Sequence, residues 1–109
     1  MRVLVLPEVR QHLKELSYTL YEKDYFSYLE TSERYVKELF DEITATLHKR
    51  LHKPAPKRFE QYGKEMEYAA FRKNKQTIWY VFFDTYKERE EVTYLVRYIT
   101  NNHEIAKYL

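Results

Sequence analysis

The first part of the chain carries apolar residues at helical spacing. A short apolar, β-branched run over residues 2–6 predicts a strand, which Pro7 ends. Over residues 8–21 an apolar residue recurs every three or four positions, so that one side of a helix would be apolar: Val9, Leu13, Leu16 and Leu20. The pattern predicts an amphipathic helix directly after the strand.

A second helical stripe follows after a few residues without a clear period. Ser27 and Glu30 have the spacing of a capping box, in which each side chain bonds the backbone amide of the other residue, so we expect the second helix to begin there. The prolines in residues 54–56 end it, because proline lacks a backbone donor and restricts the residue before it. Its inward stripe contains Tyr28, Leu29, Ser32, Val36, Leu39, Phe40, Ile43, Leu47 and Leu51. The two predicted helices form an αα-hairpin.

The second half of the chain has the composition of β-strands. Strands are predicted over residues 68–72, 77–84 and 92–100. Residues 74–75 and 85–91 are too short for the crossover that parallel strands need, so the three strands should be antiparallel. The middle strand is apolar on both faces, with Trp79, Val81 and Phe83 on one and Ile78, Tyr80 and Phe82 on the other. One face must meet the helices, and the other is covered by the chain itself or left for a partner.

Length and composition set the class. With 109 residues and no cysteine, the chain should form one domain over residues 1–109 without a disulfide framework. We expect an α+β fold with an N-terminal strand, a two-helix hairpin, a three-stranded antiparallel meander and a short C-terminal tail. No apolar run approaches the roughly 20 residues of a membrane-spanning helix, which predicts a cytoplasmic protein without a membrane partner.

Charge is distributed unevenly along the chain, although the net charge is only +2. Residues 22–42 hold seven acidic and three basic residues, whereas residues 49–75 hold nine basic and three acidic ones. The basic residues of this second segment are Lys49, Arg50, Lys53, Lys57, Arg58, Lys64, Arg72, Lys73 and Lys75. The segment either attracts a polyanion or is a solvated face.

Most kinds of catalytic site find no support in the sequence. His48 and His52 stand four positions apart, but without a third ligand nearby they predict solvated side chains near a helix C-terminus and no metal site. A single glycine cannot build a phosphate-binding loop, and no serine stands in a nucleophile-elbow setting. No cofactor is therefore expected.

Metal-free RNA cleavage remains compatible with the residue types present. It needs a base for the 2′-hydroxyl, an acid for the leaving oxygen and fixed cations for the phosphate charge. Suitable side chains are Lys57, Arg58, Lys64, Arg72, Arg97, His103 and Tyr108. Aromatic residues beside them could stack on the bases of a single strand.

Three stretches of the chain resemble the RelE/ParE superfamily of bacterial type II toxin–antitoxin modules. Residues 32–43 are similar to its second helix, residues 71–75 with 77–83 to its basic hairpin, and residues 95–99 to its last strand. The resemblance covers nearly the whole chain. It implies a toxin of a plasmid-stabilisation module that inhibits growth, and a cognate antitoxin that lays a helix and an extended segment over the toxin.

The resemblance also implies roles for individual residues. Antitoxin contacts would fall on Trp79, Tyr80 and Phe82, and a toxin dimer within the complex is a further expectation. RNA or target contacts would fall on Lys57, Arg58, Lys64, Lys73 and Lys75. In the RelE-like branch, which cuts messenger RNA on ribosomes, Arg72 and Arg97 would hold the scissile phosphate, and His103 or Tyr108 would carry a proton.

Two features favour the ParE-like branch, whose members inhibit DNA gyrase. These are the modest net charge and the long helical hairpin. In addition, a histidine often follows the last strand in the family, whereas Thr100 stands there in this chain and His103 comes three residues later, which weakens the nuclease interpretation. We therefore expect a ParE-like toxin, with a RelE-like endoribonuclease and a non-toxic interaction module as alternatives. For Arg97 the structural alternative is an ion pair with a helix carboxylate.

Overall fold

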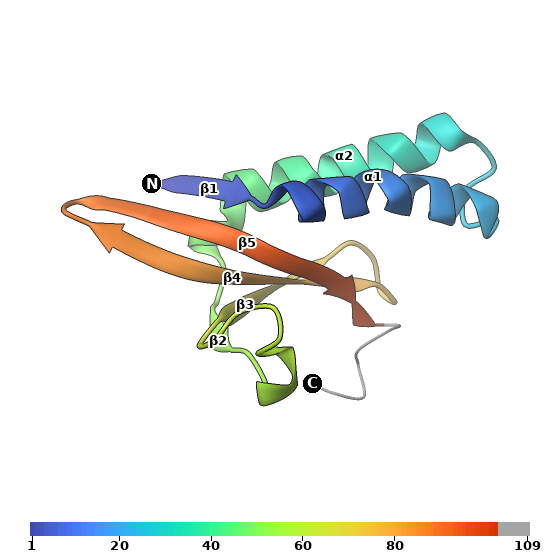
Figure 1. The fold of residues 1–109 in the computed structure, drawn as a ribbon. Helices are drawn as coiled ribbons and strands as arrows, with labels where there is room; N and C mark the ends of the chain where they lie inside the picture. Colours follow the sequence, from blue (N-terminus) through green and yellow to red (C-terminus); the bar gives the residue numbers. More distant parts are fainter. Residues whose placement is uncertain (103–109) are drawn as a thin grey trace.

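A helical hairpin covers one face of a five-stranded sheet (Figure 1). The computed structural model describes residues 1–102. The helical elements are α1 (Pro7–Glu22), α2 (Leu29–Thr46) and the short 3₁₀ turns η1 (Leu47–Lys49) and η2 (Lys57–Phe59). The strands are β1 (Arg2–Val5), β2 (Lys53–Pro54), β3 (Glu67–Arg72), β4 (Ile78–Glu88) and β5 (Glu91–Asn101). The predicted α+β class is confirmed.

The sheet is larger than the predicted three-stranded meander, and it is mixed. The strand order is β1-β5-β4-β3-β2, and β4 pairs antiparallel with both β3 and β5, as expected. β1 pairs in parallel with β5, in a register that sets Arg2 opposite Thr93, and the two-residue β2 pairs antiparallel with β3. Residues 6–90, which contain the helical hairpin and the strands β2 to β4, form the long connection that a parallel pair requires. The meander is therefore the centre of the sheet and not the whole of it.

Several element boundaries differ from the prediction. The capping box does not form, because Tyr28 precedes α2 and no side chain caps that end. The α-helix ends at Thr46 and passes into η1, so Leu51 lies outside it and is exposed. Residues 85–88 belong to β4 and not to a loop, and the turn that follows uses Arg89 with a φ of 57°.

The main core lies between the helices and the sheet. Its most deeply buried members include Leu39 and Ile43 from α2 and Phe71, Val81 and Phe83 from the sheet. Leu39 and Ile43 belong to the predicted inward stripe of the second helix, and Val81 and Phe83 were predicted to share one face of the middle strand.

A buried serine links the two helices within this core. The Ser32 hydroxyl donates a 2.7 Å hydrogen bond to the carbonyl oxygen of Ser17, across the interface between α2 and α1. Both serines are buried, and the bond satisfies a polar group that would otherwise be costly in an apolar interface. Ser32 thus occupies its place in the predicted inward stripe as a link between helices.

The opposite face of the sheet has a second, smaller core. The chain between β2 and β3 folds over this face and packs Phe59 and Met66 against Phe82, whose ring lies 4.4 Å from that of Phe59. Phe82 has no exposed surface. The alternative in which the chain covers its own second face is therefore the one observed here. None of the described helices is long and apolar enough to cross a membrane.

Candidate functional site

Arg97 lies at an irregularity between β4 and β5. Phe82 pairs with Tyr98 and Phe83 pairs with Val96, which leaves Arg97 as an extra residue opposite that step. Such a β-bulge re-aims a side chain and is common beside functional sites. The bulge directs Arg97 toward the face that lies away from the helices.

The guanidinium of Arg97 is held by its neighbours on β4. Its Nε donates to the carboxylate of Asp84, and its second terminal nitrogen donates to the Tyr86 hydroxyl at 3.2 Å. The Tyr86 hydroxyl and then the Asp84 carboxylate raise the pKa of Arg97 above its ordinary value, so the side chain is a fixed cation. The ion pair expected with a helix carboxylate is found instead with a strand carboxylate. Arg97 therefore has a structural partner within the sheet.

Gly63 makes room for this arginine. A Cβ atom at position 63 would come within 2.9 Å of Cδ of Arg97 and 3.0 Å of Sδ of Met66. The only glycine in the chain therefore lies where the segment between β2 and β3 passes close to the Arg97 side chain.

Arg72 is far from Arg97 and bound elsewhere. It pairs with Ile78 at the other end of β4, and its guanidinium bonds the backbone carbonyl of Lys75 at 3.2 Å in the following turn. From the strand register and a spacing of about 3.3 Å per residue and 4.8 Å per strand, the two arginine Cα atoms are about 18 Å apart. The two side chains also point in opposite directions along β4. The structure does not bring together the two arginines that a shared phosphate would need.

The basic residues predicted to contact RNA or a target are dispersed over two regions. Lys57, Arg58 and Lys64 are exposed on the segment that covers the second face, and Lys75 is exposed in the β3–β4 turn. Lys73 is different, since its ammonium lies 3.6 Å from Glu42 and its side chain is only 18% exposed. Lys73 is therefore not a solvent-facing cation.

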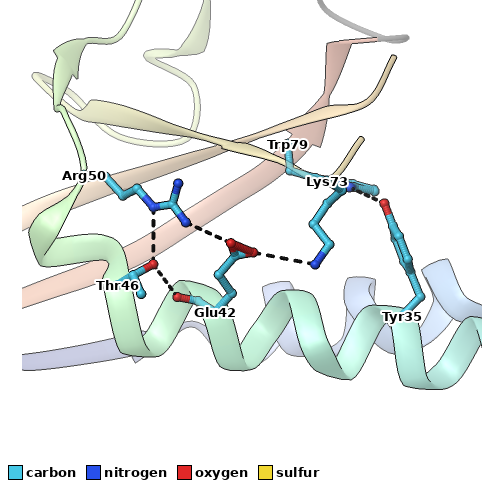
Figure 2. Close-up of polar contacts among 6 residues, drawn as sticks. All are labelled: Tyr35, Glu42, Thr46, Arg50, Lys73 and Trp79. Carbon is cyan, nitrogen blue, oxygen red and sulfur yellow. Dashed lines mark hydrogen bonds and ion pairs between the residues drawn. The ribbon is translucent and has the colours of Figure 1, made fainter. Parts of the chain in front are cut away.

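Glu42 connects α2 to the sheet through two cations (Figure 2). Its Oε1 accepts a 2.8 Å hydrogen bond from Arg50, and its Oε2 faces Lys73. Arg50 also donates to the Thr46 hydroxyl and lies over the Phe71 ring, 4.2 Å from its centre. These contacts pair Lys73 and Arg50, two members of the basic segment, with the single carboxylate of Glu42, so one of the two positive charges is balanced inside the fold.

A hydrogen bond beside this cluster joins the same two elements. Nε1 of Trp79 donates to the Tyr35 hydroxyl at 2.9 Å, as Figure 2 shows at its right side. Trp79 is 2% exposed and belongs to the main core. The bond fixes α2 against β4 next to Lys73.

The residues predicted to contact an antitoxin are mostly inside the chain. Trp79 is in the main core and Phe82 is in the second core, so neither offers a surface in this conformation. Tyr80 is half-buried at the edge of the second core, where its ring lies against Tyr68. The periodicity placed these residues on the correct faces but could not show which face the chain itself covers.

The histidines do not form a shared site. The ring of His52 packs 4.7 Å from Phe83, and its Nε2 meets the carbonyl oxygen of Leu47, while His48 belongs to η1. In residues 1–102 no three histidine or carboxylate side chains are grouped so that they could hold a metal ion. His103 and Tyr108, the predicted proton carriers, lie outside the described residues.

Sequence reasoning missed the tyrosine surface of the helical hairpin. Tyr18, Tyr21, Tyr25 and Tyr28 are four of the exposed large hydrophobic side chains in the described residues. Their close spacing in the sequence was a visible signal, but the helical pattern assigned Tyr28 to the inward stripe.

Comparison with protein-family models, with curated proteins and with solved structures finds no match for this chain.

Proposed function

We propose that this chain is the toxin subunit of a type II toxin–antitoxin module of the RelE/ParE kind, and that it acts by binding an essential macromolecular target such as DNA gyrase. The order strand, helical hairpin and antiparallel meander supports the proposal, as do the stretches of sequence that resemble the family. The proposed partner in the resting state is a cognate antitoxin, and the proposed compartment is the cytoplasm.

Arg72 and Arg97 are bonded to different partners, and this observation favours target binding over RNA cleavage. Arg97 is bonded to Asp84 and Tyr86, and Arg72 is bonded to the backbone of its own turn. Cleavage requires cations that converge on one phosphorane, already in place when charge develops. Arginines about 18 Å apart along the sheet would have to leave their partners to do so.

A RelE-like endoribonuclease is the second candidate, and one specific feature favours it. Tyr62 stacks on Tyr98 with ring centres 3.9 Å apart, and the segment that carries Tyr62 also carries the exposed cations Lys57 and Lys64. Aromatic rings flanked by cations are typical of surfaces that bind single-stranded nucleic acid. In this alternative Arg72, Arg97, His103 and Tyr108 would be the catalytic residues. A non-toxic interaction module of the same fold is the third candidate.

One experiment separates the three candidates. The chain is induced alone in a bacterial host, and growth, ribosomal messenger-RNA cleavage and gyrase supercoiling are followed together. We expect growth arrest with loss of supercoiling and without codon-positioned cleavage. Cleavage that Arg72→Ala abolishes, and that the exposed control Lys87→Ala preserves, would establish the endoribonuclease instead. Normal growth with folded protein would leave only the non-toxic module.

A further inference from the structure

The end of the helical hairpin carries an exposed group of tyrosines. We define the hairpin tip as residues 18–30, which comprise the end of α1, the connection and the start of α2, at the right of Figure 1. Its tyrosines Tyr18, Tyr21, Tyr25 and Tyr28 are 56, 38, 67 and 72% exposed. At about 200 Å² for each ring-bearing residue, they present about 450 Å² to solvent.

No aromatic pairing or hydroxyl hydrogen bond within the described residues accounts for these four tyrosines. Within residues 1–102 their rings stack on no other aromatic ring and their hydroxyls make no hydrogen bond. Tyrosine is also a mediocre helix former, so α1 gains nothing from two of them on its surface. Other tyrosines of the chain behave differently, as the stacked pair Tyr62 and Tyr98 shows. Exposed apolar area of this size matches the largest patch of a typical monomer, and such patches are often functional.

The tip is also hollowed on two sides. Tyr18 and Leu29 lie at the tip end of a mostly apolar groove of about 610 Å³ between α1 and α2. The charged residues that line this groove are Arg10, Lys14 and Lys37 against Glu33. Tyr25 and Phe26 line a second cavity of about 440 Å³ between the hairpin and the end of the sheet. A partner could insert an apolar side chain beside Tyr25 in the second cavity, which is how buried anchor residues dominate an interface. The cations of the first groove would repel a basic partner, so the contact would centre on the tip itself.

The charge of the tip selects the chemistry of that partner. Exposed Glu22, Asp24 and Glu30 stand among the tyrosines against one cation, Lys23, so the tip has a net charge of −2. Phosphates of a nucleic acid would meet like charge there, and so would the same tip of a second copy. Arginine and lysine side chains of a partner would instead form ion pairs with these carboxylates. They would also be attracted to the faces of the tyrosine rings through cation–π interactions.

We infer that the hairpin tip is a docking surface for a basic, arginine- and lysine-bearing protein surface. The inference rests on the proposed function, since it assigns the part of the chain that would meet the essential target. About 450 Å² is roughly half of the 800 Å² that each partner contributes to an interface of standard size, so the tip would form the centre of the contact.

Photo-crosslinking in the producing host tests the inference. The photoreactive amino acid p-benzoyl-phenylalanine replaces Tyr28, and in the control it replaces Leu51, which is 74% exposed at a distance from the tip. We expect crosslinking from position 28 to a host protein, at a lysine- and arginine-rich peptide identified by mass spectrometry. The pair Glu22→Lys and Glu30→Lys should lower the yield about tenfold, as expected when charge complementarity at an interface is reversed.

Matched variants keep the result interpretable. Glu88→Lys with Glu90→Lys makes the same charge change at the opposite end of the molecule, in the β4–β5 turn region, and should leave the yield unchanged. Since all these side chains are exposed, the melting temperature should move by no more than one or two degrees in either pair. If the Glu22→Lys and Glu30→Lys pair unfolds the chain, the Tyr21→Gln variant is tested in its place. That variant should show the same decrease in crosslinking yield.

Growth is recorded in the same cultures, so the inference and the proposed function can fail separately. Growth arrest with no tip crosslink, or with one that charge reversal does not change, overturns the inference and leaves the proposed function standing. A charge-dependent crosslink without growth arrest supports the docking surface and refutes the toxin assignment. Crosslinking to nucleic acid, to an acidic protein surface or to a second copy of the chain also overturns the inference.

Discussion

Replacing Arg97 by methionine should destabilise the fold measurably. Arg97→Met keeps an unbranched side chain beside Gly63 but removes the bonds to Asp84 and Tyr86, and it leaves Asp84, only 17% exposed, without its cation. Bonds to charged groups contribute about 1.5–3 kcal/mol when buried and much less when exposed. With the Arg97 side chain 29% exposed, we expect a loss of about 1.5 kcal/mol. For 109 residues this lowers the melting temperature by about 6 °C.

Thermal and urea unfolding followed by circular dichroism measure this loss. A double-mutant cycle with Asp84→Asn isolates the pair, and the coupling free energy should be about 1 kcal/mol. An unchanged melting temperature combined with lost growth arrest would refute the reasoning, because Arg97 would then act on a target or substrate and not on the sheet.

The loss should not depend on pH between 7 and 9. Tyr86 and Asp84 raise the pKa of Arg97 in the folded chain. A group with a raised folded pKa stabilises fully below its unfolded pKa and loses that contribution only as the pH rises through the folded value. Both the folded and the unfolded pKa of arginine lie far above pH 9, so the Arg97→Met difference should be equal at the two pH values.

Three further substitutions test the contacts around the sheet. Tyr35→Phe removes the acceptor of the buried Trp79 N–H, so it should cost about 1–3 kcal/mol in urea unfolding followed by the fluorescence of this single tryptophan; an unchanged midpoint would contradict the bond. Glu42→Gln should cost about 1 kcal/mol at low salt and less in 1 M salt, since screening weakens half-exposed pairs; a cost independent of salt would argue against an ionic role. Gly63→Ala should lower the free energy of unfolding by about 1 kcal/mol, and the melting temperature with it, because the added Cβ meets Arg97 at 2.9 Å. A higher melting temperature would show that the neighbouring side chains move aside at no cost.

Local patterns predicted the helices and the central strands well. Apolar spacing in residues 8–21 and the strand composition of residues 68–72 depend only on neighbours in the sequence, and both segments form the expected element. The two faces of β4 were also predicted, since alternation along a strand needs no tertiary information. The helix ends were predicted poorly, because Tyr28 precedes α2 and Ser27 makes no cap.

The candidate site was predictable only as a set of residue types. The sequence indicated Arg72 and Arg97 as cations on strands, but their separation depends on the register of three strands. It placed Lys73 in a basic segment, but the burial of Lys73 against Glu42 depends on a contact between residues 31 positions apart. The exposure of Tyr28 likewise depended on where α2 begins.

The sequence by itself determined the α+β class, the helical hairpin and the antiparallel centre of the sheet, because periodicity and short connections are local properties of the chain. Only the tertiary structure decided that β1 joins β5 in parallel, that residues between β2 and β3 cover the second face, and that a bulge turns Arg97 onto Asp84. Each of these outcomes is a contact between segments distant in the sequence. Their free energy comes from burial and pairing in three dimensions, which no local pattern of residues encodes.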